Sequence, residues 1–331
     1  MAAALAPRPR RQGVQDVTPR GGGAGAYRRA MNDAIPTMRF GPVTVHFGEK
    51  NGKYPDGNQL VVRGAEATAI FDTPQVAGRI PQVLAEADLA LLGHVHEDHM
   101  AGLHLVPGLP LHVHEADAAA VRSWEGMARH YGYDEAVLAA LRRKIEVQFH
   151  YRPRPDAIAY VDGQVWDLGG GVRVRALHLP GHTAGHSALI VEPEDLAFIG
   201  DIDLSGFGPY YGDASSDLAA FRRSLARLTE LPLRVWVTSH HKGVVTGRAK
   251  FLALLQAYAA CLDERSERLL QRLQDGPRTL AELVQQRLLY PPEAEELWID
   301  SAERRTITLH LAELHEAGRV FLQEDGRWAR A

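Results

Sequence analysis

The chain has 331 residues, of which 45% are hydrophobic and 24% charged, a balance that supplies a large apolar core and excludes a mainly disordered protein. Its apolar runs are much shorter than the ~20 residues needed to cross a bilayer, so we expect no transmembrane helix and no membrane partner. With Cys261 as its single cysteine, the chain can form no internal disulfide. We therefore expect a reducing, cytoplasmic setting, where any metal site depends mainly on histidine and carboxylate side chains.

Residues 1–36 differ in composition from the rest of the chain. They contain six arginines against two acidic residues, with scattered prolines and glycines and almost no periodic apolar pattern. This composition is typical of a disordered arm. The arm carries +4 and the whole chain −4, so residues 37–331 carry −8. Such a negative surplus disfavours nucleic acid as a partner.

Short β-type runs begin after residue 40, and each ends at a glycine or an aspartate. Helical spacing and strand-like runs then alternate. In chain order, the pattern predicts strands over 43–47, 60–63 and 67–71, a helix over 75–87, a strand over 89–93, a helix over 100–106, a strand over 111–114, and helices over 115–130 and 134–145. An extended connection rich in proline and arginine follows.

Strands dominate again from residue 158. The predicted elements are strands over 158–161, 165–168, 172–177, 187–191 and 196–199, a helix over 217–228 and a strand over 234–237. Two strand-rich halves, each closed by helices, predict an α/β fold in which two sheets pack together with helices on their outer faces.

The pattern changes once more after residue 247. It predicts a long amphipathic helix over 248–274, helices over 279–288 and 301–317, and a short hairpin over 319–328. The order helix, helix, helix, hairpin is typical of a small winged-helix-like domain. The helix that would read DNA has two arginines against three glutamates, which makes it a poor DNA reader. We therefore expect three parts: an arm over 1–36, a catalytic domain over 37–247 and a C-terminal domain over 248–331.

The segment Gly93-His94-Val95-His96-Glu97-Asp98-His99 is the most informative in the chain, because it places three imidazoles and two carboxylates directly after a buried strand. In an extended loop, alternate side chains point to one side, so His94, His96 and Asp98 can converge. His99 can swing beside Asp98 as the chain turns. Imidazole nitrogen with carboxylate oxygen suits zinc and other divalent transition metals. The loop can therefore serve two adjacent metals.

Further candidate residues follow predicted strands at four other places. Asp72, His182 and Asp201 each lie at such a strand exit, where a rigid sheet can direct a loop side chain into one cleft. The fourth strand ends at Ser239-His240-His241. Strand alternation does not decide between the two histidines, although the position directly after Ser239 favours His240.

These motifs resemble those of the metallo-β-lactamase fold superfamily. The resemblance covers about residues 41–247 and rests on Asp72 and on the H-x-H-x-D-H signature at 94–99, Pro180-Gly181-His182, Gly200-Asp201 and Ser239-His240. It implies an αββα sandwich. It also implies two metals, one held by His94, His96 and His182, the second by Asp98, His99 and His240, and both bridged by Asp201.

The same resemblance assigns supporting roles to two other residues. Asp72 would orient a ligand rather than bind metal. His186 would pack or hydrogen-bond behind the site, because the superfamily's ligand is the first histidine of the Pro-Gly-His turn. His96 stands where the family's diiron oxygen-reducing members have glutamate, which disfavours a redox function.

The sequence therefore predicts an enzyme, a metallo-β-lactamase-fold metallohydrolase with two Zn²⁺ per chain. A hydroxide held by the two metals would attack a small carbonyl substrate, a thioester, ester or lactone, with Asp98 and Asp201 as catalytic residues. A phenol of Tyr210 or Tyr211 could stabilise the developing oxyanion, or the loop after Asp201 could simply pack.

Two alternatives to this function stay open. One is a ribonuclease-like phosphodiesterase, for which arginines and a lysine over 142–154 could supply a basic patch. The other is a non-hydrolytic, iron-dependent sulfur oxidase or a binding protein. The C-terminal domain resembles a module found in some members of the superfamily, among them mitochondrial endoribonucleases. We expect it to form a homo-oligomer contact or to shape the rim of the active site.

Overall fold

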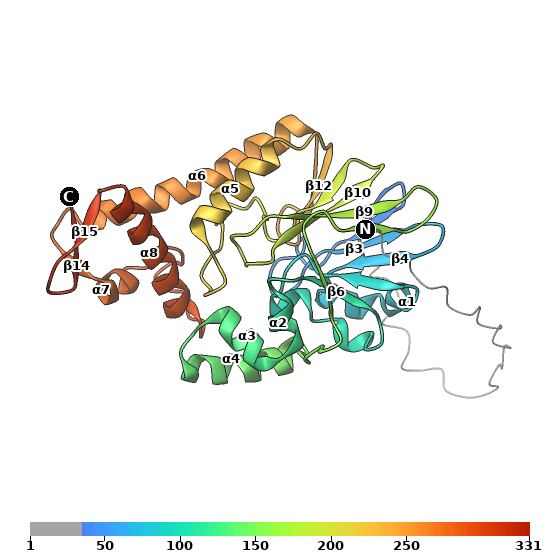
Figure 1. The fold of residues 1–331 in the computed structure, drawn as a ribbon, viewed down its shortest axis with the longest axis horizontal. Helices are drawn as coiled ribbons and strands as arrows, with labels where there is room; N and C mark the ends of the chain where they lie inside the picture. Colours follow the sequence, from blue (N-terminus) through green and yellow to red (C-terminus); the bar gives the residue numbers. More distant parts are fainter. Residues whose placement is uncertain (1–34) are drawn as a thin grey trace, which may run out of the picture.

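The structure is a computed structural model that describes residues 35–331. The predicted arm lies outside the described residues, except for Ile35 and Pro36. The main body consists of two β-sheets lying face to face, with helices on both outer sides (Figure 1). No helix of the described part is long and apolar enough to span a membrane.

The first sheet has seven strands in sequence order. They are β1 (Thr37–Phe40), β2 (Val43–His46), β3 (Gln59–Arg63), β4 (Thr68–Phe71), β5 (Leu89–Leu91), β6 (Leu111–His114) and β7 (Ile158–Tyr160). The first four strands pair antiparallel and the last four parallel. Parallel pairing requires crossover connections, and these contain α1 (Pro81–Ala85), α2 (Ala118–Arg122), α3 (Trp124–Tyr131) and α4 (Glu135–Gln148).

The second sheet has six strands in the order β13-β12-β11-β10-β9-β8. Their bounds are β8 (Val165–Asp167), β9 (Arg173–His178), β10 (Ser187–Glu192), β11 (Leu196–Phe198), β12 (Val235–Val237) and β13 (Val244–Thr246). Only the β11–β12 pair is parallel, and its crossover contains α5 (Leu218–Thr229). The other neighbours pair antiparallel.

Successive side chains of each strand point to opposite faces of its sheet, and this alternation produces the layers of the fold. Leu60 and Val62 belong to the core between the sheets, whereas Val61 packs on the outer face of the first sheet, under α1 to α4. In the second sheet, Leu189 points to the inner core and Ile190 to the outer face, where α5 packs. Because both faces of each sheet are apolar, the predicted arrangement of two packed sheets between helices is confirmed.

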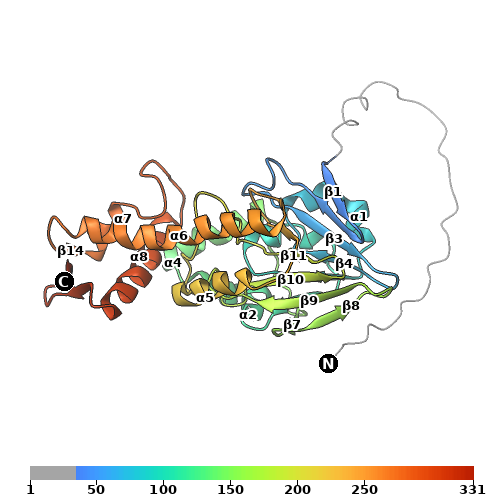
Figure 2. The same ribbon diagram turned by 90° about the horizontal axis from the view of Figure 1, so that it is seen from above.

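The C-terminal part extends away from the sandwich along α6 (Arg248–Arg272), as Figure 2 shows from above. The first half of this helix packs on the second sheet, and Leu269 and Leu270 near its end enter a separate apolar cluster. That cluster also includes side chains of α7 (Leu280–Gln285) and α8 (Ile299–Glu316). A three-stranded sheet completes the unit, in the order β14 (Arg278–Thr279), β16 (Arg327–Arg330), β15 (Val320–Leu322).

Some predicted elements were wrong in detail. The helix expected over 100–106 is only a short 3₁₀ turn at Leu103–Leu105, because the backbone N–H of Gly102 donates to Thr73 O at 2.6 Å instead of continuing a helix. The helix expected over 115–130 is broken at Ser123, whose hydroxyl caps α3 by accepting from Gly126 N. Strands β1, β13 and β14 were not expected. β1 is mostly exposed and therefore lacks an alternating apolar pattern.

Candidate metal centre and its cavity

The seven side chains predicted to bind metal lie together beside the ends of the strands. They come from the turns that follow β5, β9, β11 and β12, and they form two groups, His94, His96, His182 with Asp201, and Asp98, His99 with His240. All but Asp201 are buried. Since these turns leave rigid strands, the side chains are positioned by the sheets rather than by mobile loops.

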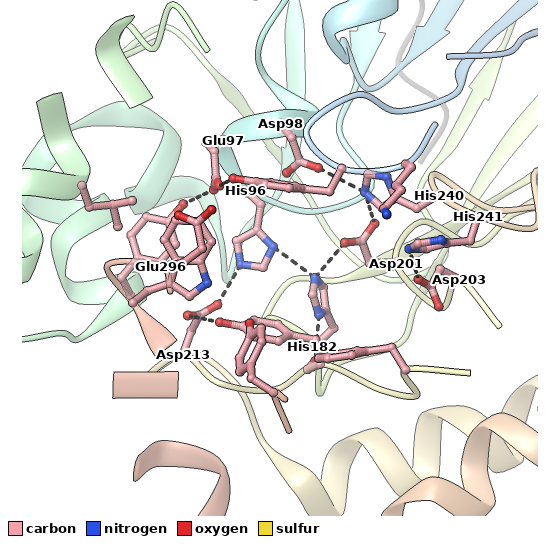
Figure 3. A pocket seen from close by; sticks show the side chains of 18 of the residues that line it. His96, Glu97, Asp98, His182, Asp201, Asp203, Asp213, His240, His241 and Glu296 are labelled. Carbon is pink, nitrogen blue, oxygen red and sulfur yellow. Dashed lines mark hydrogen bonds and ion pairs between the residues drawn. The ribbon is translucent and has the colours of Figure 1, made fainter. Parts of the chain in front are cut away.

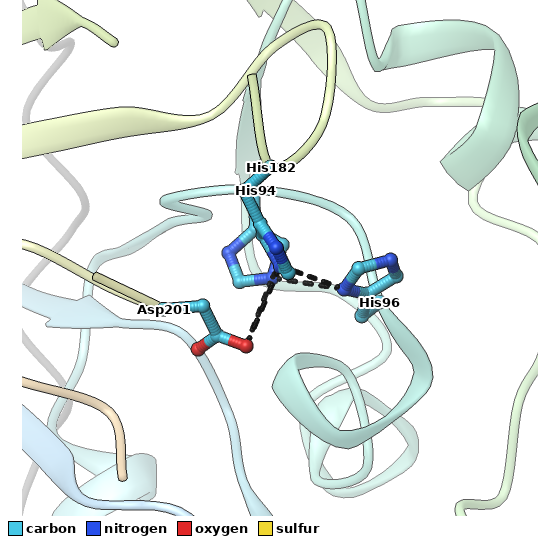
Figure 4. A group of neighbouring side chains, drawn as sticks. All are labelled: His94, His96, His182 and Asp201. Atoms are coloured by element: carbon cyan, nitrogen blue, oxygen red, sulfur yellow. Dashed lines mark hydrogen bonds and ion pairs between the residues drawn. The ribbon is translucent and has the colours of Figure 1, made fainter. Parts of the chain in front are cut away.

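The first group brings three imidazole nitrogens to one point (Figure 4). His94 Nε2 lies 3.2 Å from His96 Nδ1, and His182 Nε2 lies 3.2 Å and 3.1 Å from these two atoms. Asp201 Oδ2 faces the same point, 3.4 Å from His182 Nε2 and 3.8 Å from His94 Nε2. The three nitrogens and the carboxylate oxygen therefore surround a common centre.

The second group surrounds the other oxygen of the same carboxylate. Asp201 Oδ1 lies 3.1 Å from His99 Nε2 and 3.3 Å from His240 Nε2. Asp98 Oδ2 lies 3.1 Å from His240 Nε2 and 3.7 Å from His99 Nε2. Asp201 therefore directs one oxygen to each group, which is the arrangement that a bridging carboxylate needs.

Partners on the outer ring nitrogens hold four of the five imidazoles. His182 Nδ1 donates to Tyr210 O at 2.9 Å, and His240 Nδ1 donates to Gly52 O at 2.6 Å. The outer nitrogens of the remaining two face carboxylates, His96 Nε2 at 2.8 Å from Asp213 Oδ2 and His99 Nδ1 at 2.7 Å from Asp72 Oδ2. An outer N–H that is donated leaves a lone pair on the inner nitrogen, the form in which imidazole binds a metal.

These residues fit a pair of divalent cations. Lone pairs of several nitrogens that face each other at 3.1–3.2 Å repel unless a cation lies between them. Zinc–nitrogen bonds of about 2.0–2.1 Å in tetrahedral geometry place ligand atoms roughly 3.3–3.4 Å apart, close to the observed spacing. Among the described residues, His99 Nε2 and Asp201 Oδ1 are buried without a hydrogen-bond partner, as metal ligands would be.

Burial and neighbouring charged groups shift the pKa values of residues in the two groups. Burial, reinforced by the neighbouring His99, lowers the pKa of His94 well below its ordinary value. Burial alone would raise the pKa of Asp201, but the imidazoles of His240 and His99 hold it well below the usual range. The carboxylate of Asp201 is thus ionised and His94 is neutral, which suits metal binding.

Three further polar residues, Asp72, His186 and His241, lie beside the two groups without belonging to them. Asp72 accepts from Gly93 N at 2.8 Å with the oxygen that does not face His99, so it joins the two strand exits. His186 lies behind the site and its Nε2 accepts from Asp201 N at 3.3 Å; burial and the nearby His182 lower its pKa to about 3. His241 turns away from both groups, with Nε2 at 3.6 Å from Asp203 Oδ2.

The sequence reasoning missed two aspartates that organise the site. Asp117 Oδ2 accepts from Thr183 Oγ1 at 2.7 Å and from Val95 N at 3.2 Å, so it joins the two loops that carry the first group. Asp213 holds His96 and also accepts from Tyr210 OH at 3.2 Å. No short motif marks either residue, since Asp213 lies 117 positions from His96 in the chain.

The C-terminal unit contacts the loop that carries Asp213. Arg305 of α8 donates to Asp213 O at 3.1 Å and to Ser216 O at 2.8 Å. The hydroxyl of Ser216 in turn donates to His182 O at 2.7 Å. A Cβ atom at Gly212 would lie 3.0 Å from Ala302 Cα, so α8 packs directly on this loop. Helix α8 therefore holds the loop whose side chains contact the ring of His96 and the carbonyl of His182.

A cavity of about 430 Å³ opens above both groups (Figure 3). Asp98, Asp201, His96, His182 and His240 form part of its floor. Its walls come from the segment of α3 and α4, from the loop after β11 and from the segment between α7 and α8. The prediction that the C-terminal part shapes the rim is therefore matched by its position. Tyr210 lines the cavity, but Tyr211 is fully buried, with its hydroxyl 2.7 Å from His310 Nε2, and cannot reach a substrate.

Comparisons with known proteins agree with this architecture, although no family model matches the chain. It is 30% identical over 230 residues to a hydroxyacylglutathione hydrolase of Methylococcus capsulatus, covering 69% of this chain and 78% of that protein. It is 29% identical to an atrochrysone carboxyl ACP thioesterase of Aspergillus chevalieri, covering 66% of this chain and 64% of that one.

Solved structures show the same fold. A metallo-beta-lactamase family protein from Thermus thermophilus matches with a TM-score of 0.63 and 27% identity, over 83% of this chain and 94% of that one. A beta-lactamase domain protein from Burkholderia ambifaria matches with a TM-score of 0.63 and 21% identity, over 90% and 96% of the two chains. Together with the sandwich and the two ligand groups, these similarities establish that the chain belongs to the metallo-β-lactamase superfamily and is a hydrolase of that fold.

Proposed function

We propose that this chain is a two-metal hydrolase of small carbonyl substrates, and of thioesters in particular. One observation carries the proposal: two groups of ligand-type side chains share Asp201 at the floor of one cavity. His94, His96 and His182 would hold one metal, Asp98, His99 and His240 the second, and Asp201 both. Zn²⁺ suits this set of imidazoles and carboxylates. When bound, two such cations lower the pKa of water toward neutrality and polarise a substrate carbonyl.

The chain's own residues supply orientation and exclude bulk water. The carboxylate of Asp98 faces the cavity beside His240 and can accept a hydrogen bond from an attacking water molecule. Tyr210 stands on the opposite side of the floor, with its carbonyl holding His182 and its ring in the wall. Because a thiol has a pKa of about 8.5, a thiolate leaves without protonation by a strong acid, so the reaction needs no such acid among the residues that line the cavity.

The relatives support the thioester as substrate class, since one is named a hydroxyacylglutathione hydrolase and the other an ACP thioesterase. The charges argue against the phosphodiesterase alternative. Several cations that could have formed a basic patch are paired with carboxylates: Arg142 with Glu146, Lys144 with Glu296 and Arg154 with Asp156. RNA cleavage normally needs unpaired basic side chains for the flanking phosphates. We interpret the C-terminal unit as winged-helix-like, and its homo-oligomer contact stays a prediction.

The test combines metal content with turnover of the full chain. We expect about two equivalents of zinc per chain, hydrolysis of thioesters, and loss of both in Asp201→Ala. A protein that carries both metals and turns over no thioester, ester or lactone, but cleaves single-stranded RNA in a manner abolished by Asp98→Ala, would transfer the assignment to the phosphodiesterase.

A further inference from the structure

The walls of the cavity are made of aromatic rings from separate parts of the chain. Besides four histidines and Leu141 of α4, the uncharged lining residues are Tyr54, Tyr131, Tyr133, Phe207, Tyr210, Tyr290 and Trp298. They come from the loop after β2, from the end of α3 and the turn after it, from the loop after β11 and from the segment between α7 and α8. An aromatic wall assembled from four segments is a specific feature of the tertiary structure.

The hydroxyl groups of four of these tyrosines are already engaged by two buried carboxylates. Glu97 accepts from Tyr54 OH at 3.0 Å and from Tyr131 OH. Asp213 accepts from Tyr210 OH at 3.2 Å and from Tyr133 OH. A phenol has one hydrogen to donate. The four side chains therefore present their rings, rather than hydrogen-bond donors, to whatever occupies the cavity.

The C-terminal contribution to the wall is held in place. The buried carboxylate of Glu303 in α8 accepts from Leu289 N at 2.8 Å and from Tyr290 N at 2.9 Å. At the other end of the segment, Lys144 of α4 lies 2.8 Å from Glu296 Oε2 and 4.4 Å from the ring centre of Trp298. These contacts hold the backbone at Tyr290 and the ring of Trp298 before a substrate arrives, so this part of the wall is preformed.

The charges around the cavity define what it can accept. Among the described side chains that line it, Lys53 is the one lysine or arginine, whereas Glu97, Asp203, Asp213 and Glu296 are acidic residues outside the ligand groups. An anionic substituent would meet more negative than positive charge. A short hydroxylated substituent would find phenols whose hydrogens are already donated. An apolar substituent would gain from burial against the rings.

We infer that the aromatic wall binds the acyl group of the substrate and selects an aromatic or alkyl acyl group over a short hydroxylated or charged one. The inference rests on the proposed function, and it makes Tyr290 and Trp298 residues that determine specificity. A hydrophobic pocket typically discriminates 10- to 200-fold for each methylene group. We therefore expect a preference of at least about tenfold in kcat/KM for apolar acyl groups.

The experiment uses the metal-loaded full chain and four thioesters of a single thiol, N-acetylcysteamine, so that only the acyl group varies. Phenylacetyl and hexanoyl thioesters should exceed acetyl and lactoyl thioesters in kcat/KM by at least about tenfold. In Trp298→Ala and in Phe207→Ala, this preference should fall by about tenfold. Phe207 is 41% exposed, so its replacement leaves the core intact and provides a second variant should Trp298→Ala not fold.

Leu297→Ala is the matched control, because Leu297 precedes Trp298 and is 47% exposed without lining the cavity. It should keep the wild-type preference. A second readout is independent of turnover: the phenylacetyl ketone in which CH₂ replaces the sulfur should bind, by calorimetry, about tenfold more weakly to Trp298→Ala than to Leu297→Ala.

Two outcomes separate this inference from the proposed function. Equal kcat/KM for all four thioesters, or a preference for lactoyl, overturns the selection of apolar acyl groups and leaves thioester hydrolysis standing. No turnover of any thioester by a protein that carries both metals overturns the proposed function itself.

Discussion

The floor and the walls of the cavity are built in different ways. The floor consists of side chains in the turns that follow strands, and four of the five imidazoles in the two ligand groups have a partner that fixes the orientation of the ring. The walls come from α3, α4 and two long loops, and part of them from a C-terminal unit outside the sandwich. The ligand-type side chains therefore belong to the sandwich itself, whereas we propose that the choice of substrate depends on the segments around it.

The largest effect should follow from breaking the floor at Asp201. Because its two oxygens face the two groups, Asp201→Ala should lose both metals and reduce kcat by ~10³-fold or more. His182→Ala should likewise abolish turnover. His186→Ala should keep substantial activity, since His186 contacts only backbone groups behind the site: its Nε2 accepts from Asp201 N and its Nδ1 donates to Leu179 O. Elemental analysis with kcat measurements checks all three variants. Equal losses at His186 and His182 would contradict the assignment.

A more selective change distinguishes two adjacent histidines. His240→Ala should remove about one equivalent of metal, because His240 Nε2 faces both Asp98 and Asp201 at 3.1–3.3 Å. His241→Ala should keep both equivalents, since His241 pairs with Asp203 at 3.6 Å and is 39% exposed. Metal content of the two variants, measured side by side, decides the matter. Metal loss confined to His241→Ala would move the ligand assignment by one residue.

A smaller effect should follow from removing the contact between α8 and the loop that carries Asp213. Arg305→Ala removes the donors that hold the backbone at Asp213, the residue that orients His96. Loss of a residue that hydrogen-bonds a metal ligand typically costs 10–100-fold in metal affinity. Arg305 acts on such a residue rather than on the ligand itself, so we expect a smaller effect, about 3- to 10-fold weaker cobalt binding in the first group. The d–d absorption of Co²⁺ reports this directly. Arg304→Ala, on the exposed side of the same helix, should leave the cobalt titration unchanged. Equal affinity in both variants would show that α8 does not support the site.

The smallest effect concerns the stability of the contact between α6, α8 and the loop after β11. Burial, with Arg265 and Arg222 nearby, lowers the pKa of His310 to about 3, while an unfolded histidine has a pKa of about 6.5. The folded state therefore loses stability as pH falls from about 6.5 toward 3, because only the unfolded chain gains this proton. His310→Gln should reduce the slope of the unfolding free energy against pH by up to about 1.4 kcal/mol per pH unit. Urea unfolding between pH 7 and pH 4.5 measures it, and identical slopes in both proteins would refute the effect.

Local sequence patterns were enough to predict the sandwich and the positions of the ligand-type side chains along the chain. The H-x-H-x-D-H segment and the other strand exits are local patterns, and a buried apolar strand followed by a polar turn needs no knowledge of distant contacts. The strand over 111–114 was predicted with its correct bounds, and the two strand-rich halves became the two sheets.

How these residues are arranged in space depends on packing between distant segments of the chain. His240 and His241 lie in a turn in which His241 adopts a positive φ of 56°, so the two side chains point in different directions, which alternation along a strand cannot predict. Asp213 and Asp117 act across 117 and 66 residues of chain, on His96 and Thr183. The aromatic wall likewise joins segments from Tyr54 to Trp298. Contacts of this kind depend on how helices and loops pack on the finished sheets, and packing over such separations leaves no periodic signal in the sequence.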